Sequence, residues 1–262
     1  MPLQSVFSCY FCDRMKKLVL LFLLAVCCSF AQGQNDPSLD YFNKGLENYY
    51  AGNHMYAREL FTLSLKTDAK NELAYYNRGM CSYALQNYRD ALHDFSRATK
   101  LKKQYTNGYI GQAVTYIGMK QYAKAVKLAN KALQVDPASY LAHYNKGLAL
   151  YNLEQYPAAM NEFDNVLMIR SGYADAFVYK GLINYSTGND KMAVDNFTQA
   201  INNSPENALA YYNRALARLR MDYKAAACED LSKSAELGYE SAAVLLKVHC
   251  KPANPAPAKE NK

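Results

Sequence analysis

A 34-residue period constrains the fold of this chain more than any other feature of its sequence. The period begins at Ser38 and runs through six units with no insertion or deletion between them. A fixed repeat of this length is the signature of a stacked architecture, in which each unit packs on its neighbours and no single compact core is required. Position 1 of the six units falls at Ser38, Glu72, Thr106, Tyr140, Ala174 and Ala208.

Each unit has the pattern of two antiparallel helices. Positions 4, 8 and 12 share one face of a first helix, and positions 20, 24 and 27 share one face of a second. Position 8 is glycine in four units, although glycine inside a helix costs about 1 kcal/mol relative to alanine. Position 20 is alanine in every unit, so we expect the two helices to approach closely there, with a bulky residue beside them. The glycines are Gly45, Gly79, Gly147 and Gly181, and the bulky residues of position 24 are Phe61, Phe95, Phe163, Phe197 and Leu231.

Turn residues separate the helices at regular places. Residues 51–53 (AGN) and 187–189 (TGN) divide a first helix from a second, and Pro137 and Pro205 close second helices at position 32. No stretch shows the alternation of a half-buried strand. The sequence therefore predicts an all-α chain of helical hairpins.

These features resemble the tetratricopeptide repeat, whose 34-residue pattern has an aromatic residue, then glycine, then A-x3-F, then proline. The resemblance covers residues 38–250, with an aromatic residue or histidine in place of tryptophan at position 4. It implies a right-handed superhelical solenoid of antiparallel hairpins, with a concave groove lined by the first helices. The residues of position 4 are Tyr41, Tyr75, Tyr109, His143, Phe177 and Tyr211.

The two ends of the chain depart from the repeat. Residues 241–250 (SAAVLLKVHC) are expected to form a capping helix, because a terminal repeat otherwise leaves an apolar face in water. Residues 251–262 are rich in Pro, Lys and Ala and are expected to be a disordered tail.

The first 31 residues have the features of a secretory signal. Lys16 and Lys17 form a positive segment, and residues 18–28 are an apolar run. Small residues follow at Ser29 and Ala31, or at Ala31 and Gly33, and either pair fits a cleavage site. Met15 lies directly before the lysines and is the expected true start. Residues 24–27 (LAVC) resemble a lipoprotein signal, but valine stands where a small residue is needed, so cleavage after the small residues is favoured. We expect an exported protein of the periplasm or cell envelope.

Three cysteines remain after such cleavage: Cys81, Cys228 and Cys250. Export favours disulfide formation, and Cys228 and Cys250 lie 22 residues apart, within the reach of one hairpin. A bridge between them would hold the end of the stack, and two separate buried thiols are the alternative. Cys81 is expected to be a small packed residue.

No pattern of a catalytic or metal site is present. The four histidines have no metal-ligand spacing, and the sequence contains no phosphate-binding glycine loop and no nucleophile elbow. The net charge of +7 is modest and has no focused basic stripe. We therefore expect no enzyme, no cofactor, no metal, no nucleic-acid partner and no small-molecule substrate.

The first helices offer an ordered set of candidates for peptide binding. Tyrosine gives a large rigid contact area with a polar tip, and an asparagine side chain can both donate to and accept from a peptide backbone. The resemblance places positions 5 and 6 on or near the concave face, although Gly111 and Tyr179 interrupt the asparagine row. The candidates are Phe42, Asn43, Tyr76, Asn77, Tyr144, Asn145, Tyr212 and Asn213.

Packing is the alternative for each of these rows. For position 5 exposure and packing are equally favoured, and for position 6 the alternative is a solvated residue that bonds a neighbouring repeat. At position 12 packing between helices is favoured; these tyrosines are Tyr49, Tyr83, Tyr151 and Tyr185. The basic residues of position 7, such as Arg78, are interpreted as a solvated face. The apolar row at position 9 argues against an acidic ligand.

The sequence thus predicts a scaffold or adaptor that binds protein or peptide segments in its groove. The alternative is a structural subunit of a larger envelope complex that uses its convex surface and its ends. Neither hypothesis names an individual partner.

Overall fold

The computed structural model describes residues 36–250, which form thirteen α-helices and no strand. The predicted signal segment and the predicted tail both lie outside these residues. Each repeat is a hairpin of an A helix and a B helix, as the sequence predicts. The A helices are α2 (Pro37–Tyr50), α4 (Glu72–Ala84), α6 (Thr106–Gly118), α8 (Tyr140–Asn152), α10 (Ala174–Ser186) and α12 (Ala208–Arg220). The B helices are α3 (His54–Thr67), α5 (Tyr88–Leu101), α7 (Tyr122–Val135), α9 (Tyr156–Ile169), α11 (Asp190–Asn203) and α13 (Lys224–Glu236).

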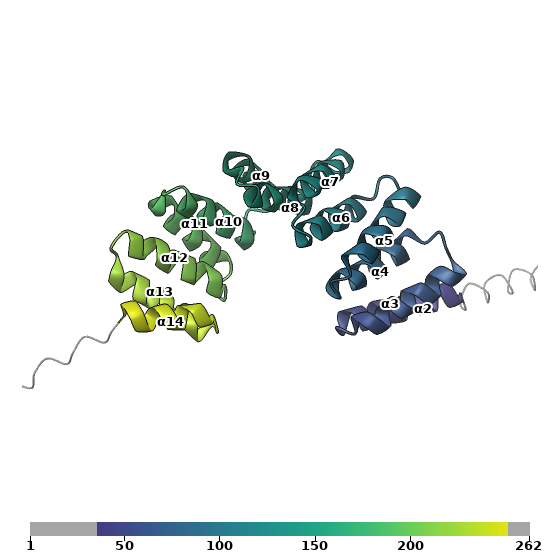
Figure 1. Cartoon of the computed structure of the whole chain (residues 1–262), viewed down its shortest axis with the longest axis horizontal. Helices are drawn as coiled ribbons and strands as arrows, with labels where there is room; N and C mark the ends of the chain where they lie inside the picture. The colour runs from purple at the N-terminus through teal and green to yellow at the C-terminus, as the bar shows by residue number, and fades with distance from the viewer. Residues whose placement is uncertain (1–35, 251–262) are drawn as a thin grey trace, which may run out of the picture. The chain divides into compact units, whose positions relative to one another are not determined.

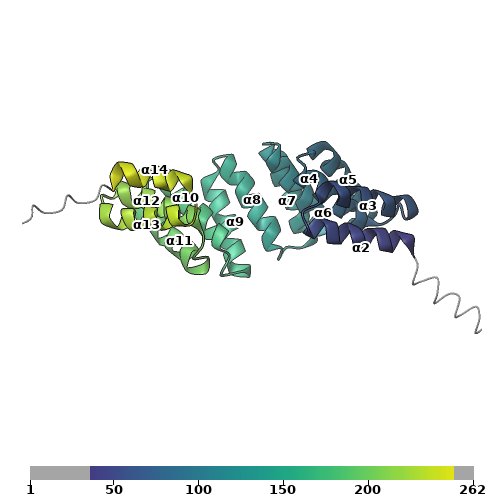
Figure 2. The same cartoon turned by 90° about the horizontal axis from the view of Figure 1, so that it is seen from below.

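The described residues fall into two compact units, divided between Lys103 and Gln104. The first unit holds α2 to α5, which are the first two repeats. The second holds the other four repeats and the terminal helix α14 (Glu240–His249). Within each unit the hairpins follow one another in chain order (Figures 1 and 2). The unbroken 34-residue period gives no sign of this division.

The ends of the A helices are set by the same two positions in successive repeats. At position 34 the side chains of Asn71, Ser139 and Asn207 accept a hydrogen bond from a backbone N–H in the first turn of the following A helix. At position 15 the backbone takes positive φ in all six repeats, which stops the A helix and starts the turn. Position 15 is glycine only twice; its residues are Gly52, Gln86, Lys120, Glu154, Gly188 and Asp222.

Glycine at position 8 makes room for the phenylalanine of position 24. A Cβ atom built on Gly181 would lie 2.5 Å from Cε1 of Phe197, and one on Gly79 would lie 2.9 Å from Cε1 of Phe95. Position 8 is alanine only in the two repeats without that phenylalanine, where Ala113 and Ala215 occur. The alanines of position 20 are fully buried in all six repeats. The predicted close approach of the two helices is confirmed.

The A helices of consecutive repeats pack more closely together than the B helices do, and the layer that they form is here called the inner layer. Beyond the contacts within hairpins, α2 contacts α4 in the first unit, and α6, α8, α10 and α12 contact one another in sequence in the second. Within residues 36–250 no comparable contact joins the B helices of consecutive repeats. The B helices therefore splay apart, and the A helices form the more closely spaced layer. None of the described helices has the length and apolar character needed to span a bilayer.

Helix α14 closes the second unit and begins one residue before the predicted capping segment. Its Ala242 packs into a cluster with Leu231 of α13. On its other side Val244 and Val248 remain about three-fifths exposed. A disulfide joins Cys250, directly after α14, to Cys228 on α13, with the two Cα atoms 5.7 Å apart. Cys81, the third cysteine of residues 36–250, is a buried free thiol, and burial raises its pKa to about 12.

Reduction of this disulfide is expected to lower the free energy of unfolding of the second unit by about 2–4 kcal/mol, the usual range for a bridge that closes a loop of this size. The measurement is urea denaturation followed by circular dichroism, with and without reductant. The double variant Cys228→Ser, Cys250→Ser provides the control, because reductant should not change its transition. A wild-type transition that is the same in both conditions would contradict the prediction.

Candidate functional site

The predicted peptide-binding residues lie on four A helices and are divided between the two units. Helices α2 and α4 carry Phe42, Asn43, Tyr76 and Asn77 in the first unit, and α8 and α12 carry Tyr144, Asn145, Tyr212 and Asn213 in the second. Each unit therefore presents its own set of residues on its inner layer of helices.

The asparagines of position 6 bind their own helix rather than a neighbouring repeat. The side-chain amides of Asn77, Asn145 and Asn213 donate to the backbone carbonyls of Leu73, Leu141 and Leu209, four residues earlier, at 2.7–2.8 Å. Asn145 and Asn213 are less than a tenth exposed. One N–H of each amide is thus already engaged, and the second N–H and the Oδ1 atom are left to bond a ligand.

The aromatic residues of position 5 pack on the core of their own hairpins. The ring centroids of Phe42 and Phe61 are 5.6 Å apart, and those of Tyr76 and Phe95 are 5.5 Å apart. The ring of Tyr212 lies 4.8 Å from that of Tyr239, the residue that precedes α14. These side chains are only half-buried, so position 5 combines packing with a partly open surface.

Five tyrosines form one connected cluster in the second unit, here called the tyrosine cluster: Tyr140, Tyr144, Tyr151, Tyr173 and Tyr179. Neighbouring rings lie 5.3–6.0 Å apart, mostly edge to face, an arrangement that adds about 0.5–1.5 kcal/mol per pair beyond burial. Tyr179 replaces the position 6 asparagine and stacks on Phe163. The interruption noted in the asparagine row is therefore the centre of this cluster.

Four of the hydroxyl groups in the tyrosine cluster are held in the neutral form by their surroundings. Burial raises the pKa values of Tyr144, Tyr151, Tyr173 and Tyr179 above that of a free tyrosine. Tyr144 and Tyr179 are also hydrogen-bonded to each other. A neutral phenol can both donate and accept, so the cluster offers polar contacts to a ligand without adding charge.

The tyrosines of position 12 pack at the turn that starts the B helix. Tyr49 lies 5.1 Å from the ring of His54, and Tyr83 lies 5.7 Å from that of Tyr88. In the fifth repeat the guanidinium of Arg220 lies over the ring of Tyr185, 4.2 Å from its centroid. The favoured interpretation of this row as packing agrees with these contacts.

A row of exposed leucines at position 2 lies one helical turn before the asparagines. These leucines were not identified from the sequence as candidates for binding. Four of the six repeats have leucine there, and each is exposed although it lies on the inner layer of helices. The exposed fractions are 52% for Leu39, 43% for Leu73, 37% for Leu141 and 40% for Leu209. The recurrence at the repeat spacing was a signal in the sequence, but leucine is so common in helices that the row was not distinguished from core residues.

The interpretation of position 7 as a solvated basic face is wrong for most repeats. Arg78 donates through Nε and Nη2 to both oxygens of Asp94 at 2.8 Å, and through Nη1 to Thr62 of the preceding repeat at 3.3 Å. The same arrangement joins Arg214 to Asp230. Lysines at this position are paired too: Lys146 with Glu162 and Lys180 with Asp164. Only Lys44, which pairs with Asp40 on its own helix, is largely exposed.

No group of three or more potential metal-ligating side chains comes together among residues 36–250. The inner faces instead combine exposed apolar side chains with carbonyl and hydroxyl groups, which suits recognition of another polypeptide.

Two family models of the tetratricopeptide repeat match the sequence, one over residues 72–105 and the other over residues 110–175. A comparison with curated proteins gave no match.

Many solved structures share the fold. The APC/C hetero-tetramer Cut9–Hcn1 superposes with a TM-score of 0.73 and 16% identity, over 82% of this chain and 43% of the other. PilW, a widely conserved type IV pilus biogenesis factor, superposes with a TM-score of 0.72 and 20% identity, over 82% and 98%. YrrB, a repeat protein with an unusual peptide-binding site, has a TM-score of 0.55 and 21% identity, over 72% and 97%. At these identities the likeness concerns the fold.

Three observations identify the same repeat: the matches to the family models, the pairs of glycine and phenylalanine, and the hairpin architecture. The chain contains tetratricopeptide repeats, which the two models match over residues 72–105 and 110–175.

Proposed function

We propose that this chain is an exported scaffold that binds extended protein segments on the inner layer of A helices. The tetratricopeptide repeat is a fold that acts through binding surfaces rather than through catalysis. PilW is a pilus biogenesis factor and YrrB has an unusual peptide-binding site, and both are in keeping with such a role.

The observation that carries the proposal is the stripe of positions 2, 6 and 9 in the second unit. On α8 it consists of Leu141, Asn145 and Leu148, and on α12 of Leu209, Asn213 and Leu216. The leucines offer apolar contact, while the asparagine Oδ1 atoms are acceptors for the N–H groups of an extended peptide. Tyr179 on α10 adds a hydroxyl group between them. This combination favours a segment with apolar side chains over an acidic one.

Export is the second part of the proposal. It is supported by the charged, apolar and small-residue segments of residues 1–31 and by the cysteine pair of the last repeat, because disulfides persist in oxidising compartments. A periplasmic or envelope location follows, with the partner expected among envelope proteins.

One observation favours the alternative of a structural subunit in an envelope complex. Val244 and Val248 stand one turn apart on α14 and are both exposed, at the end of the stack rather than on its inner layer. A protein that docks there would not use the leucine and asparagine stripe, so the two functions are separable by mutation.

The double variant Leu141→Ser, Leu209→Ser is expected to weaken binding of a selected peptide by at least tenfold. Burying one leucine contributes about 1.5–3 kcal/mol, and 1.4 kcal/mol corresponds to a tenfold change in Kd. Peptides are first selected from a random display library on the wild-type protein and then synthesised with one tryptophan. Because the chain has no tryptophan, fluorescence of the peptide alone reports binding.

The matched control is Met168→Ser, Met192→Ser, which removes two exposed apolar side chains from the B helices α9 and α11. This control should bind the peptide as the wild type does. Equal affinity for the leucine variant and the wild type would exclude binding at the stripe. Equal loss in both variants would show a general effect of surface polarity.

A further inference from the structure

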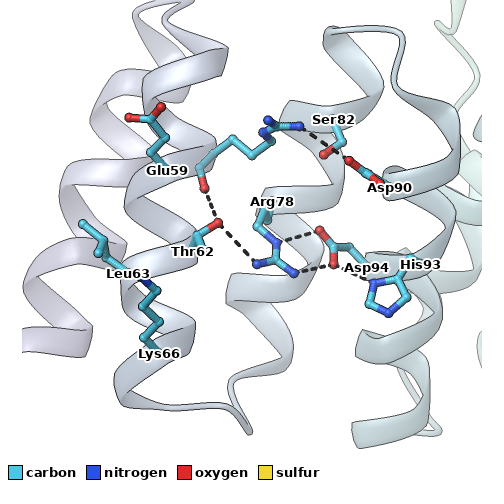
Figure 3. Close-up of a pocket in the computed structure, with 10 residues that line it drawn as sticks. Glu59, Thr62, Leu63, Lys66, Arg78, Ser82, Asp90, His93 and Asp94 are labelled. Atoms are coloured by element: carbon cyan, nitrogen blue, oxygen red, sulfur yellow. Dashed lines mark hydrogen bonds and ion pairs between the residues drawn. The ribbon is translucent and has the colours of Figure 1, made fainter.

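A groove of about 570 Å³ lies in the first unit, on the side of the B helices. Its walls come from α3 and α5, and α4 forms its floor (Figure 3). The splaying of consecutive B helices opens this space. It is therefore separate from the leucine and asparagine stripe, which lies on the layer of A helices.

The floor of the groove is a Thr–Arg–Asp arrangement that recurs in the sixth repeat. In the first unit Arg78 lies between Thr62 and Asp94, as Figure 3 shows. In the second unit Arg214 lies between Thr198 and Asp230, with distances of 3.0 and 2.6 Å. The two arginines are 136 residues apart, which is four repeats. The surroundings of Arg78 can therefore be compared with those of Arg214 position by position.

The two sites differ at position 11 of the A helix. In the sixth repeat Arg218 occupies this position and donates to Oδ2 of Asp230 at 2.7 Å and to the carbonyl of Ala226 at 3.1 Å. Asp230 thus binds two arginines. In the second repeat position 11 is Ser82, whose side chain is far too short to reach Asp94. The groove is the space that the longer side chain would fill.

The hydroxyl group of Ser82 is buried without a hydrogen-bond partner among the described atoms. Ser82 lines the groove and is only 1% exposed. Buried hydroxyl groups are normally hydrogen-bonded. Within residues 36–250, Oδ2 of Asp94 accepts from Arg78 alone, whereas Oδ2 of Asp230 accepts from both of its arginines.

We propose that this groove binds an arginine side chain of a partner protein, whose guanidinium takes in the second repeat the place that Arg218 takes in the sixth. The planar guanidinium has five donors, so it can reach Asp94, Ser82 and the acidic rim together. A lysine ammonium would lack this fork geometry.

The charges around the groove balance, so the preference for a cation rests on which of the pairs can exchange. Three cations line it (Arg58, Lys66 and Arg78), and three carboxylates balance them (Glu59, Asp90 and Asp94). The strongest of the cations, Arg78, is already held by both oxygens of Asp94. Arg58 faces Asp90 at 3.6 Å, and both side chains are more than a third exposed, so an incoming guanidinium can displace Arg58. His93 approaches Asp94 from the outer side, with Nδ1 3.3 Å from Oδ1.

The test is an NMR titration of the full chain with the peptide acetyl-Gly-Arg-Gly-amide. Saturable shifts are expected for the backbone amides of Ser82, Asp90 and Asp94. The same peptide with citrulline, which has the shape of arginine but no charge, should give none. Ser82→Arg fills the groove from within and should weaken binding at least tenfold.

Two further variants keep the proposal testable should Ser82→Arg fail to fold. Arg58→Gln removes the competitor for Asp90 and should tighten binding of the arginine peptide, whereas it would weaken binding of an anion. Arg218→Ser should create a second site in the sixth repeat, seen as new shifts at Asp230. The proposal is overturned by no shifts with the arginine peptide, by equal shifts with citrulline, by weaker arginine binding in Arg58→Gln, or by preference for acetyl-Gly-Glu-Gly-amide.

Discussion

Replacing Asp230 with asparagine is expected to lower the free energy of unfolding of the second unit by about 3–5 kcal/mol, the range for removing one partner of a buried ion pair. The side chain of Asp230 is only 4% exposed, and it neutralises both Arg214 and Arg218, which are 12% and 21% exposed. Asparagine keeps the shape but not the charge, so two arginines would remain buried without a counter-ion. The loss is measured by urea denaturation followed by circular dichroism.

Two comparisons separate the buried charge from other effects of the substitution. Asp40→Asn removes the partner of Lys44 at a largely exposed pair, where no measurable change is expected. The triple variant Arg214→Met, Arg218→Leu, Asp230→Leu removes all three charges together and should recover most of the stability, because apolar replacement of a buried ionic group is often neutral or better. A loss below about 1 kcal/mol for Asp230→Asn would contradict the prediction, since the pair would then contribute no more than an exposed one.

The hairpins and their tight core could be predicted from the sequence because their determinants recur at one spacing. Gly79 and Phe95 are 16 residues apart, and the same pair returns three more times. Where Phe is missing the glycine is missing too, as at Ala215 and Leu231. Local spacing of this kind reports a contact within one hairpin, which every repeat makes in the same way.

The ion pairs of position 7 were not predicted, because the acidic partner differs in residue type and lies in the same hairpin in some repeats and in the preceding hairpin in another. Arg78 pairs with Asp94 in its own hairpin, but Lys180 pairs with Asp164 in the preceding one. An acid 16 residues after the cation was a usable signal in three repeats. A charged residue on a helix is more often solvated than buried, and only the packed structure shows that the B helices cover it.

The candidate site was located in part. The helices that hold the predicted residues form as expected, but the asparagine amides turn back to their own helix, and the exposed leucines of position 2 were not identified. Leu141 and Asn145 are four residues apart and share one helical face, so the carbonyl of the first is the nearest acceptor for the second. Exposure depends on how closely neighbouring A helices approach, which a single repeat does not determine.

Replacing Gly181 with alanine is expected to destabilise the second unit by up to about 2 kcal/mol, although alanine is the better helix former. The added Cβ would lie 2.5–2.8 Å from three ring atoms of Phe197, which is fully buried and cannot move aside. Overpacking of this kind costs about 1–3 kcal/mol, and the gain in helix propensity offsets about 1 kcal/mol of it. Unfolding in urea, followed by circular dichroism, measures the balance.

The sixth repeat supplies the control, because it pairs Ala215 with Leu231 at the same two positions. Phe197→Leu alone should also be destabilising, since it leaves a cavity beside Gly181. The double variant Gly181→Ala, Phe197→Leu rebuilds the pair of the sixth repeat and should be more stable than the sum of the two single effects predicts, with a coupling of about 0.5–3 kcal/mol. Additive effects would show that Gly181 is required for a reason other than the ring of Phe197. A positive coupling would establish that each repeat chooses its position 8 residue to fit its position 24 residue, and hence that the two helices of a hairpin are specified as one unit.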